Sequence, residues 1–457
     1  MNIETTLATL KEQFNLDASS KILVVGLGVT GTAVTRYLDK LGFYYAIVDS
    51  RAKPPLMADF IESHPETPVF TGGFHADAFA VASHLIVSPG IALHEIPIQN
   101  ALARGAVCLS DIDLFACSVN APIVGITGSN GKSTVTTMVG DMARQAGKKV
   151  GVGGNLGVPA LDLISSEVEL YVLELSSFQL ERVSMLNAVA SSVLNISADH
   201  LDRHADLADY ARQKQAIFRG TGWIVINVDD AVVSGMQADY SGRNILTFGL
   251  KHPADFTVGT VEGIEQLMYR QQPLMPVSEL PLEGGHNVAN ALAALAIGYA
   301  INLPFEPMCI ALRKFKSLAH RMQKVAVVND VTWINDSKAT NIGACVAALD
   351  GYTRPLILLA GGDAKGADMQ ELVPTIRNKV KSVVLMGKDA HLIEQAIDGC
   401  VPVYRATTIQ QAVKIAAGLA QTGDCVLLSP ACASIDQFRD YKDRGEQFSR
   451  AVLELAS

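Results

Sequence analysis

A glycine-rich loop with a lysine and two hydroxyl side chains stands out at residues 121–134, which read A-P-I-V-G-I-T-G-S-N-G-K-S-T. The apolar run predicts a buried strand, and the lysine and hydroxyl residues open the helix that follows. In such a loop, backbone N–H groups surround phosphate oxygens, the lysine adds positive charge and a hydroxyl binds Mg²⁺. Ile126 stands where the strict phosphate-loop pattern has its first glycine. We predict an ATP-binding loop with the residues Gly128, Ser129, Asn130, Gly131, Lys132, Ser133 and Thr134.

Two side chains that follow or end apolar runs are candidate site residues, and the first is a candidate ligand of the metal that ATP requires. Glu174 closes the run L-Y-V-L-E, and His200 follows another run in N-I-S-A-D-H. Ligands of open parallel sheets bind at the carboxyl edge of the strands, so we expect both side chains at that edge. Glu174 is the first predicted Mg²⁺ ligand, together with the Ser133 hydroxyl. A solvated acid and a structural histidine are the alternatives.

Lys214 lies in A-D-Y-A-R-Q-K-Q-A-I-F, where helical spacing places it on one face with Tyr210, Ile217 and Phe218. An ammonium group on an apolar face is costly unless it is neutralised, paired or chemically altered. A lysine with a lowered pKa can react with CO₂ to give a carbamate, whose anionic oxygens suit Mg²⁺. The alternative is a lysine whose stem is buried while its ammonium group reaches solvent.

A second glycine motif, G-L-G-V-T-G at residues 26–31, lies between an expected strand and an expected helix. Asp49 closes the next expected strand, which matches the spacing of a dinucleotide-binding fingerprint. The motif predicts a nucleotide diphosphate at the start of the helix. Spacing leaves open whether the ligand is NAD or another nucleotide, and a tight turn without a ligand is the alternative.

Further polar clusters open helices or follow apolar runs later in the chain. Asn287 and Asn290, in G-G-H-N-V-A-N, either contact a nucleotide base or cap a helix. Asp336 and Thr340 lie in W-I-N-D-S-K-A-T-N, a density of polar groups that is typical of a site. The segments G-G-D-A-K-G and S-P-A-C-A-S also follow apolar runs, at the expected ligand-binding edge of a third sheet.

The elements that position these motifs form three blocks of β-branched runs, glycine turns and alanine-rich helices, which is typical of α/β domains with parallel sheets. We expect a Rossmann-like domain at residues 1–110, a central phosphate-loop ATPase domain at 111–317, and a second Rossmann-like domain at 318–457. The 457 residues suffice for three cores.

Composition narrows the classes of partner. Hydrophobic residues make up 49% of the chain and charged residues 18%, which excludes a disordered protein. The net charge of −9 argues against binding nucleic acid through its backbone. No run reaches the length of a membrane span, and the seven cysteines form no C-x-x-C pair. We expect a cytoplasmic protein, with no membrane partner, that functions as a monomer.

The motifs together resemble the Mur ligase family. The resemblance rests on G-I-T-G-S-N-G-K-S-T, Y-V-L-E-L-S-S-F-Q-L, H-N-V-A-N-A-L-A-A, N-D-S-K-A-T-N and L-S-P-A-C-A-S, and their order covers nearly the whole chain. It implies that ATP phosphorylates the carboxylate of a nucleotide precursor and that the amine of an amino acid attacks the acyl phosphate. The implied substrates are UDP-N-acetylmuramoyl-L-alanine and D-glutamate, with ATP and Mg²⁺. The first glycine motif would then bind UDP.

The resemblance also implies a role for individual residues. Lys132, His200 and Lys214 would be catalytic, with the last as a carbamate beside a second Mg²⁺. The residues implied for ATP outside the loop are Asn287, Asn290, Arg321 and Asp336. Those implied for the UDP precursor are Val29, Thr30, Asp49, Ser50, Arg51, Ser88, Pro89, Gly90 and Asn155. Those implied for D-glutamate are Thr340, Lys365, Ser434 and Tyr441, the last where the family has phenylalanine.

Three other functions fit part of the sequence. A folylpolyglutamate synthetase shares the ATPase core but has no counterpart of the N-terminal glycine motif. An NAD-dependent oxidoreductase fits Gly26 to Asp49 and leaves the phosphate loop unexplained. A nucleotide switch without ligase activity fits the loop alone and leaves Arg321 to Thr340 without a role.

Overall fold

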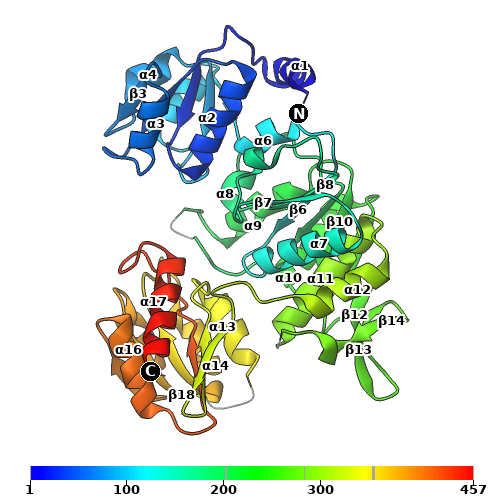
Figure 1. Cartoon of the computed structure of the whole chain (residues 1–457), viewed down its shortest axis with the longest axis vertical. Helices are drawn as coiled ribbons and strands as arrows, with labels where there is room; N and C mark the ends of the chain where they lie inside the picture. Colours follow the sequence, from blue (N-terminus) through cyan, green and yellow to red (C-terminus); the bar gives the residue numbers. More distant parts are fainter. Residues whose placement is uncertain (1, 201–202, 283, 353–355, 456–457) are drawn as a thin grey trace.

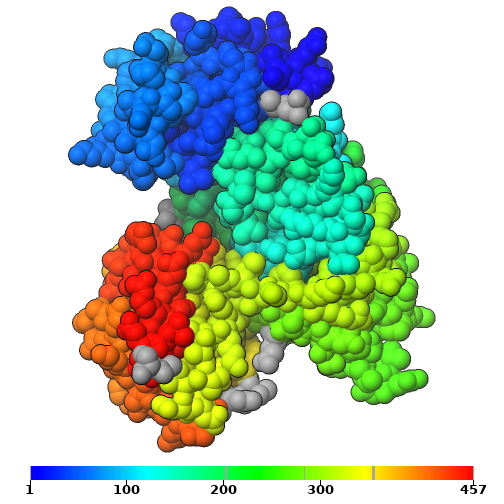
Figure 2. Space-filling model, in the orientation of Figure 1, coloured from blue at the N-terminus to red at the C-terminus, as the bar shows by residue number. Residues whose placement is uncertain are grey.

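The computed structural model describes residues 2–200, 203–282, 284–352 and 356–455. Its strands form three separate sheets, one in each block of the sequence. Figure 1 shows these as three bodies, coloured blue, cyan to green, and yellow to red along the chain. In the space-filling view of Figure 2, the N-terminal and C-terminal bodies lie at opposite ends, with the central body beside both. The predicted three-domain α/β class is confirmed.

The N-terminal sheet has five parallel strands in the order β3-β2-β1-β4-β5. The order reverses at β1, so the carboxyl ends of β1 and β4 flank the crevice where such sheets bind nucleotides. Gly31 allows α2 to start against this edge, because a Cβ there would overlap the Gly26 carbonyl oxygen. The elements are α1 (Ile3–Phe14), β1 (Ile22–Val25), α2 (Val29–Leu41), β2 (Tyr45–Asp49), α3 (Met57–Ser63), β3 (Val69–Thr71), α4 (Ala76–Val81), β4 (His84–Val87), α5 (Ile96–Ala103) and β5 (Val107–Leu109).

The central sheet has nine strands in the order β14-β13-β12-β11-β10-β9-β6-β8-β7. Strands β6 to β11 are parallel, whereas β12, β13 and β14 form antiparallel hairpins that the sequence analysis did not anticipate. The sheet is flanked by helices, and β6 lies between β8 and β9. The strands are β6 (Ile123–Thr127), β7 (Val150–Gly154), β8 (Leu170–Glu174), β9 (Ala190–Val193), β10 (Trp223–Asn227), β11 (Ile245–Phe248), β12 (Phe256–Val261), β13 (Ile264–Tyr269) and β14 (Gln272–Pro276).

Helix α11 (Gly285–Ala300) is buried along most of its length and packs against α7 (Lys132–Gln145), the helix that follows the phosphate loop. Its many alanines let the two helices approach closely, since small side chains leave room between backbones. This packing brings the first turn of α11 to the phosphate loop. The other helices of the domain are α6 (Asp111–Ala116), α8 (Ser177–Leu180), α9 (Leu207–Gln215), α10 (Ala231–Met236) and α12 (Phe305–Lys314).

The C-terminal sheet has six strands in the order β15-β16-β20-β17-β18-β19, all parallel except the β15–β16 pair. A hydrophobic core covers each face, as in a doubly wound domain. The elements are β15 (Gln323–Val328), β16 (Val331–Asn335), α13 (Ile342–Asp350), β17 (Leu356–Ala360), α14 (Val373–Lys379), β18 (Val380–Leu385), α15 (Ala390–Ile397), β19 (Val403–Arg405), α16 (Ile409–Leu419), β20 (Cys425–Leu428) and α17 (Tyr441–Glu454).

The expected domain boundaries at 110 and 317 fall between sheets, because β5 ends at Leu109 and β15 begins at Gln323. The boundaries themselves stay a prediction. Within the described ranges, no helix combines the length and the apolar character needed to cross a membrane.

Candidate active site at the junction of three domains

The phosphate loop joins the end of β6 to the start of α7, as predicted. Gly128 and Gly131 adopt φ values of 147° and 82°, which favour glycine. A Cβ on Gly131 would also collide with the side-chain oxygen of Asn290 on α11. Lys132 Nζ donates to the carbonyls of Gly128 and Ser129, at 2.8 and 2.9 Å, which holds the ammonium group over the loop. The loop is therefore shaped as a cradle for phosphate oxygens.

Glu174, at the end of β8, accepts a hydrogen bond from the Ser133 hydroxyl at 2.5 Å and another from Asn155 Nδ2 at 2.7 Å. Burial raises the pKa of this carboxyl. The positive charge of Lys132 and the hydrogen bonds from Ser133 and Asn155 outweigh burial, so the net pKa lies below its usual range. An ionised carboxylate beside a serine hydroxyl is the donor set that Mg²⁺ prefers next to a phosphate. Both predicted ligands therefore fit the metal.

Arg321 reaches the same serine from the C-terminal domain, and its Nη2 donates to Ser133 Oγ at 2.6 Å. Asn130 of the phosphate loop and Asn341 of the C-terminal domain exchange hydrogen bonds at 3.2 and 3.4 Å. The phosphate loop is thus in direct contact with the third domain. Arg321, which was expected to contact ATP from that domain, lies at this contact.

Lys214, on α9, is only 1% exposed. Its Nζ lies 4.6 Å from the centre of the Tyr210 ring and donates to Thr127 Oγ1 at 3.3 Å. Burial, reinforced by the charge of Lys132, holds its pKa well below the usual value. The side chain does not reach solvent, so the alternative of an exposed ammonium group is wrong. This environment favours the neutral form of the amine.

His200 lies after β9, at the carboxyl edge of the sheet, with a left-handed backbone at φ 55°. Its ring packs edge-on against Phe178 at 4.9 Å. Over the described ranges, no group of three or more His, Cys, Asp and Glu side chains is arranged to hold a metal. A second metal near His200 would therefore need ligands of another kind, such as a modified lysine or substrate oxygens.

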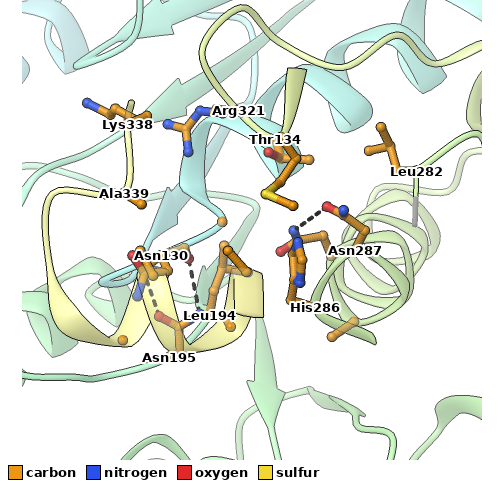
Figure 3. Close-up of a pocket in the computed structure, with 18 of the residues that line it drawn as sticks. Asn130, Thr134, Leu194, Asn195, Leu282, His286, Asn287, Arg321, Lys338 and Ala339 are labelled. Carbon is orange, nitrogen blue, oxygen red and sulfur yellow. Dashed lines mark hydrogen bonds between the residues drawn. The ribbon is translucent and has the colours of Figure 1, made fainter. Parts of the chain in front are cut away.

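A cavity of about 360 Å³ lies between the phosphate loop, α11 and the C-terminal domain. Figure 3 shows Asn130 and Asn195 on one side of it, His286 and Asn287 on the other, and Arg321 above them in this view. The residues predicted for ATP that line it are Asn130, Gly131, Thr134, Asn287, Asn290, Arg321 and Asp336.

Two ionisable groups at this cavity, the buried Asp336 and the half-buried Lys338, have strongly shifted pKa values. Burial raises the pKa of Asp336 to about 7, although Ser429 Oγ donates to its carboxylate at 3.0 Å. Burial and the charges of Arg321 and Lys132 lower the pKa of Lys338 to about 7. Lys338 Nζ lies 3.9 Å from the centre of the Tyr441 ring. Arg321 and Lys338 are basic side chains of this lining, and an anionic ligand beside them would favour the protonated form of Lys338.

A second cavity, of about 600 Å³, lies where the N-terminal domain meets the central domain. Every residue predicted for the UDP precursor lines it. Asp49 accepts from Leu27 N at 2.8 Å and from Arg51 Nη2 at 2.7 Å, so the carboxylate orients the guanidinium at the mouth of the glycine loop. Asn155 lines this cavity and also binds Glu174, which connects the precursor cavity to the phosphate loop.

The residues predicted for D-glutamate are only partly brought together. Thr340 and Lys365 line a nearly closed pocket with Asp199 and Asn341, whereas Ser434 and Tyr441 lie outside its lining. Tyr441 packs instead over Lys338. Two of its lining residues form an ion pair, with Lys365 Nζ 2.5 Å from Asp199 Oδ1.

Asp199 and Arg444 contact this region but were not singled out from the sequence. Asp199 binds Lys365 and accepts from Asn341 Nδ2 at 3.0 Å. Its position beside His200, in the segment that follows β9, was the available signal. Arg444 is buried and donates to the carbonyls of Ser337 and Cys432 at 2.8 and 3.2 Å. Nothing in the local pattern of α17 distinguishes this arginine from an exposed one.

Replacing Gly131 with alanine should weaken ATP binding by at least about tenfold, because the new Cβ would displace Asn290 from the cradle. Gly147→Ala is the matched control at the other end of α7. Gly147 has φ 84° and open space around it, so the control carries the same backbone strain, about 1 kcal/mol, without the collision. Calorimetric titration with ATP and Mg²⁺ measures both. Equal ATP affinities in the two variants would contradict the cradle.

ATP binding should take up protons at pH 8 and less at pH 6. In the free protein Lys338, with a pKa of about 7, is mostly neutral at pH 8, and a neighbouring polyphosphate raises that pKa and adds a proton. At pH 6 the proton is already bound. Calorimetry in two buffers with different heats of ionisation measures the uptake. Lys338→Met should reduce the uptake at pH 8, and an unchanged value would contradict this assignment.

Known families match the chain in three consecutive parts. The "Mur ligase MurD-like, N-terminal domain" matches residues 20–110, the "Mur ligase middle domain" matches 126–298, and the "Mur ligase, glutamate ligase domain" matches 320–432. Two similar relatives are both named UDP-N-acetylmuramoylalanine--D-glutamate ligase. The protein from Methylococcus capsulatus is 49% identical over 97% of this chain and 97% of its own length. The protein from Pseudomonas putida is 48% identical over 95% of this chain and 97% of its own.

Solved structures share the fold at low identity. The UDP-N-acetylmuramate-alanine ligase MurC from Thermotoga maritima has a TM-score of 0.60 at 18% identity and covers 95% of this chain and 99% of its own. MurF from Acinetobacter baumannii has a TM-score of 0.58 at 17% identity and covers 79% of this chain and 87% of its own. Sequence identity over nearly the full length, three matching domains and a shared fold lead to one conclusion: the chain belongs to the Mur ligase family.

Proposed function

We propose that this chain is an ATP-dependent ligase that joins D-glutamate to UDP-N-acetylmuramoyl-L-alanine in the synthesis of peptidoglycan precursors. The main support for the proposal is the pair of hydrogen bonds that Glu174 accepts. One comes from Ser133, next to the phosphate loop, and the other from Asn155, which lines the precursor cavity. They set the end of the precursor cavity beside the place where the γ-phosphate of ATP would lie. The names of the relatives support the choice of both substrates.

The reaction has two steps in this proposal. A carboxylate oxygen of the precursor attacks the γ-phosphorus, the bond from that phosphorus to ADP breaks, and an acyl phosphate forms. The amine of D-glutamate then attacks the acyl carbon, phosphate leaves with the bonding electrons, and the nitrogen loses its proton as the amide forms. Both steps gain from a rigid arrangement of positive charge around the transferring group.

The side chains of the phosphate loop would supply most of that charge. Lys132 would hold the β- and γ-phosphates, and Arg321 would add a guanidinium from the C-terminal domain. Mg²⁺, held by Ser133 and Glu174, would neutralise charge on the phosphate oxygens. Closure of the third domain would complete the site, since the Arg321 contact with Ser133 crosses between domains.

Lys214 would enter as a carbamate. Its burial favours the neutral amine, which is the form that reacts with CO₂, and the product would carry an anionic oxygen toward the phosphate loop. With His200 it would surround a second Mg²⁺. Thr340, Lys365, Ser434 and Tyr441 would take D-glutamate once the Asp199–Lys365 ion pair opens. We also propose that the protein acts in the cytoplasm as a monomer.

The function is tested by phosphate release with ATP, Mg²⁺ and UDP-N-acetylmuramoyl-L-alanine, with D-glutamate, L-glutamate, L-lysine and meso-diaminopimelate in separate reactions. Release only with D-glutamate is the expected result. Release with another amino acid would keep the ligase chemistry and overturn the substrate. ATP binding without release in any reaction would favour a nucleotide switch.

Lys214→Ala should be nearly inactive and partly rescued by added short carboxylates such as acetate, because the small side chain leaves room for a carboxylate in place of the carbamate. Lys148→Ala, at an exposed lysine beyond α7, is the control and should behave as the wild type in both conditions. Phosphate release measures both. Full activity of Lys214→Ala without carboxylate would remove the carbamate from the proposal.

A further inference from the structure

An arginine of the central domain binds the segment from Val87 to Ile91 in the N-terminal domain. This segment begins at the last residue of β4. Arg182, just after α8, donates from Nη1 to the carbonyls of Val87 and Ser88, both at 3.0 Å, and from Nη2 to Ile91 at 3.1 Å. Ser88, Pro89, Gly90 and Ile91 of this loop line the precursor cavity. A central-domain side chain therefore contacts the N-terminal wall of that cavity through three hydrogen bonds.

A second arginine makes the same kind of contact from a different segment. Arg203, which lies between β9 and α9, donates to the carbonyls of Gly90 and Ile91 at 3.2 and 3.3 Å. The Glu181 carboxylate lies 3.0 Å from Arg182 and 3.6 Å from Arg203, so it joins the two guanidinium groups. We refer to Glu181, Arg182 and Arg203 as the interdomain clamp.

The clamp is costly to bury. The Arg182 side chain is 1% exposed, and burial lowers its pKa although Glu181 opposes that shift. Its Nε is buried without a hydrogen-bond partner among the described residues. A hydrophobic contact would hold two domains together at lower cost, because an ionised group loses its hydration on burial. Directional bonds to successive carbonyls, in contrast, determine where a loop lies.

The same segment of the central domain is also part of the site. Phe178 on α8 lines the precursor cavity, lies 4.9 Å from the Arg203 guanidinium and packs against the ring of His200. The helix follows Glu174 by only a short turn. The clamp thus links the wall of the precursor cavity to the segment that follows Glu174.

We propose that Glu181, Arg182 and Arg203 are positioning residues for the ligation. They set the distance between the loop that holds the precursor and the phosphate loop, so that the precursor's carboxylate meets the γ-phosphate. This inference rests on the proposed function. Without the clamp, the loop at residues 87–91 can shift relative to Glu174, and small displacements of a bound substrate lower the rate strongly.

The test is steady-state kinetics of Arg182→Ala, with Arg182→Lys as the conservative variant and Arg144→Ala, an exposed arginine on α7, as the control. Arg182→Ala should raise the KM for UDP-N-acetylmuramoyl-L-alanine at least about tenfold and lower kcat, with the KM for ATP within about twofold of wild type. Arg182→Lys should recover part of the effect, because an ammonium group can still bind a carbonyl. If Arg182→Ala does not fold, Arg203→Gln supplies the same readout with Arg182 in place.

An unchanged KM for the precursor in the clamp variants would overturn the inference. So would an equal rise in the KM for all three substrates, which would indicate general damage instead of a misplaced loop. Calorimetric binding of the precursor to the wild-type chain without ATP separates the two proposals. Absence of precursor binding to the wild type refutes the proposed function, whereas wild-type affinity in Arg182→Ala, with an unchanged kcat, refutes the clamp alone.

Discussion

The Glu174 carboxylate is the point on which the arrangement of the site depends. It ends a fully buried strand, and its oxygens are shared between the Ser133 hydroxyl and the Asn155 amide. Lys132 helps to keep it ionised in spite of burial. Because one oxygen faces the phosphate loop and the other the precursor cavity, two binding sites built on different loops meet at one charge. The role proposed for the clamp, which contacts residues 87–91, depends on this fixed carboxylate.

The third domain contributes polar contacts to the site. Arg321 binds Ser133, Asn341 pairs with Asn130, and Lys365 binds Asp199. Two of these contacts involve a group that a substrate could bind instead: a phosphate could bind the arginine, and a carboxylate could bind the lysine. Contacts that substrates can replace allow the domain to open and close at small cost, which suits a site that must admit three substrates.

Much of this could be predicted from the sequence, because the phosphate loop, the strand that ends at Glu174 and the N-terminal glycine motif are local patterns. The three sheets followed from these patterns, whereas most of the residues that line the precursor cavity were implied by the resemblance to the Mur ligase family. The hairpins β12 to β14 were missed, because their strands are exposed or half-buried over most of their length and lack the continuous apolar runs that marked the buried strands. Contacts between domains were also out of reach. The pairing of Asp199 with Lys365, and the reach of Arg182 to Ile91, depend on how separate domains pack, which no local pattern records.

If the precursor's carboxylate meets the γ-phosphate beside Glu174, one carboxylate oxygen becomes bonded to phosphorus during turnover. An oxygen isotope label follows this transfer directly. UDP-N-acetylmuramoyl-L-alanine labelled with ¹⁸O in its carboxylate is turned over with ATP, Mg²⁺ and D-glutamate, and the released phosphate is analysed by mass spectrometry. Each released phosphate should contain one labelled oxygen, because that oxygen becomes bonded to phosphorus in the acyl phosphate. Released phosphate without the label would contradict it.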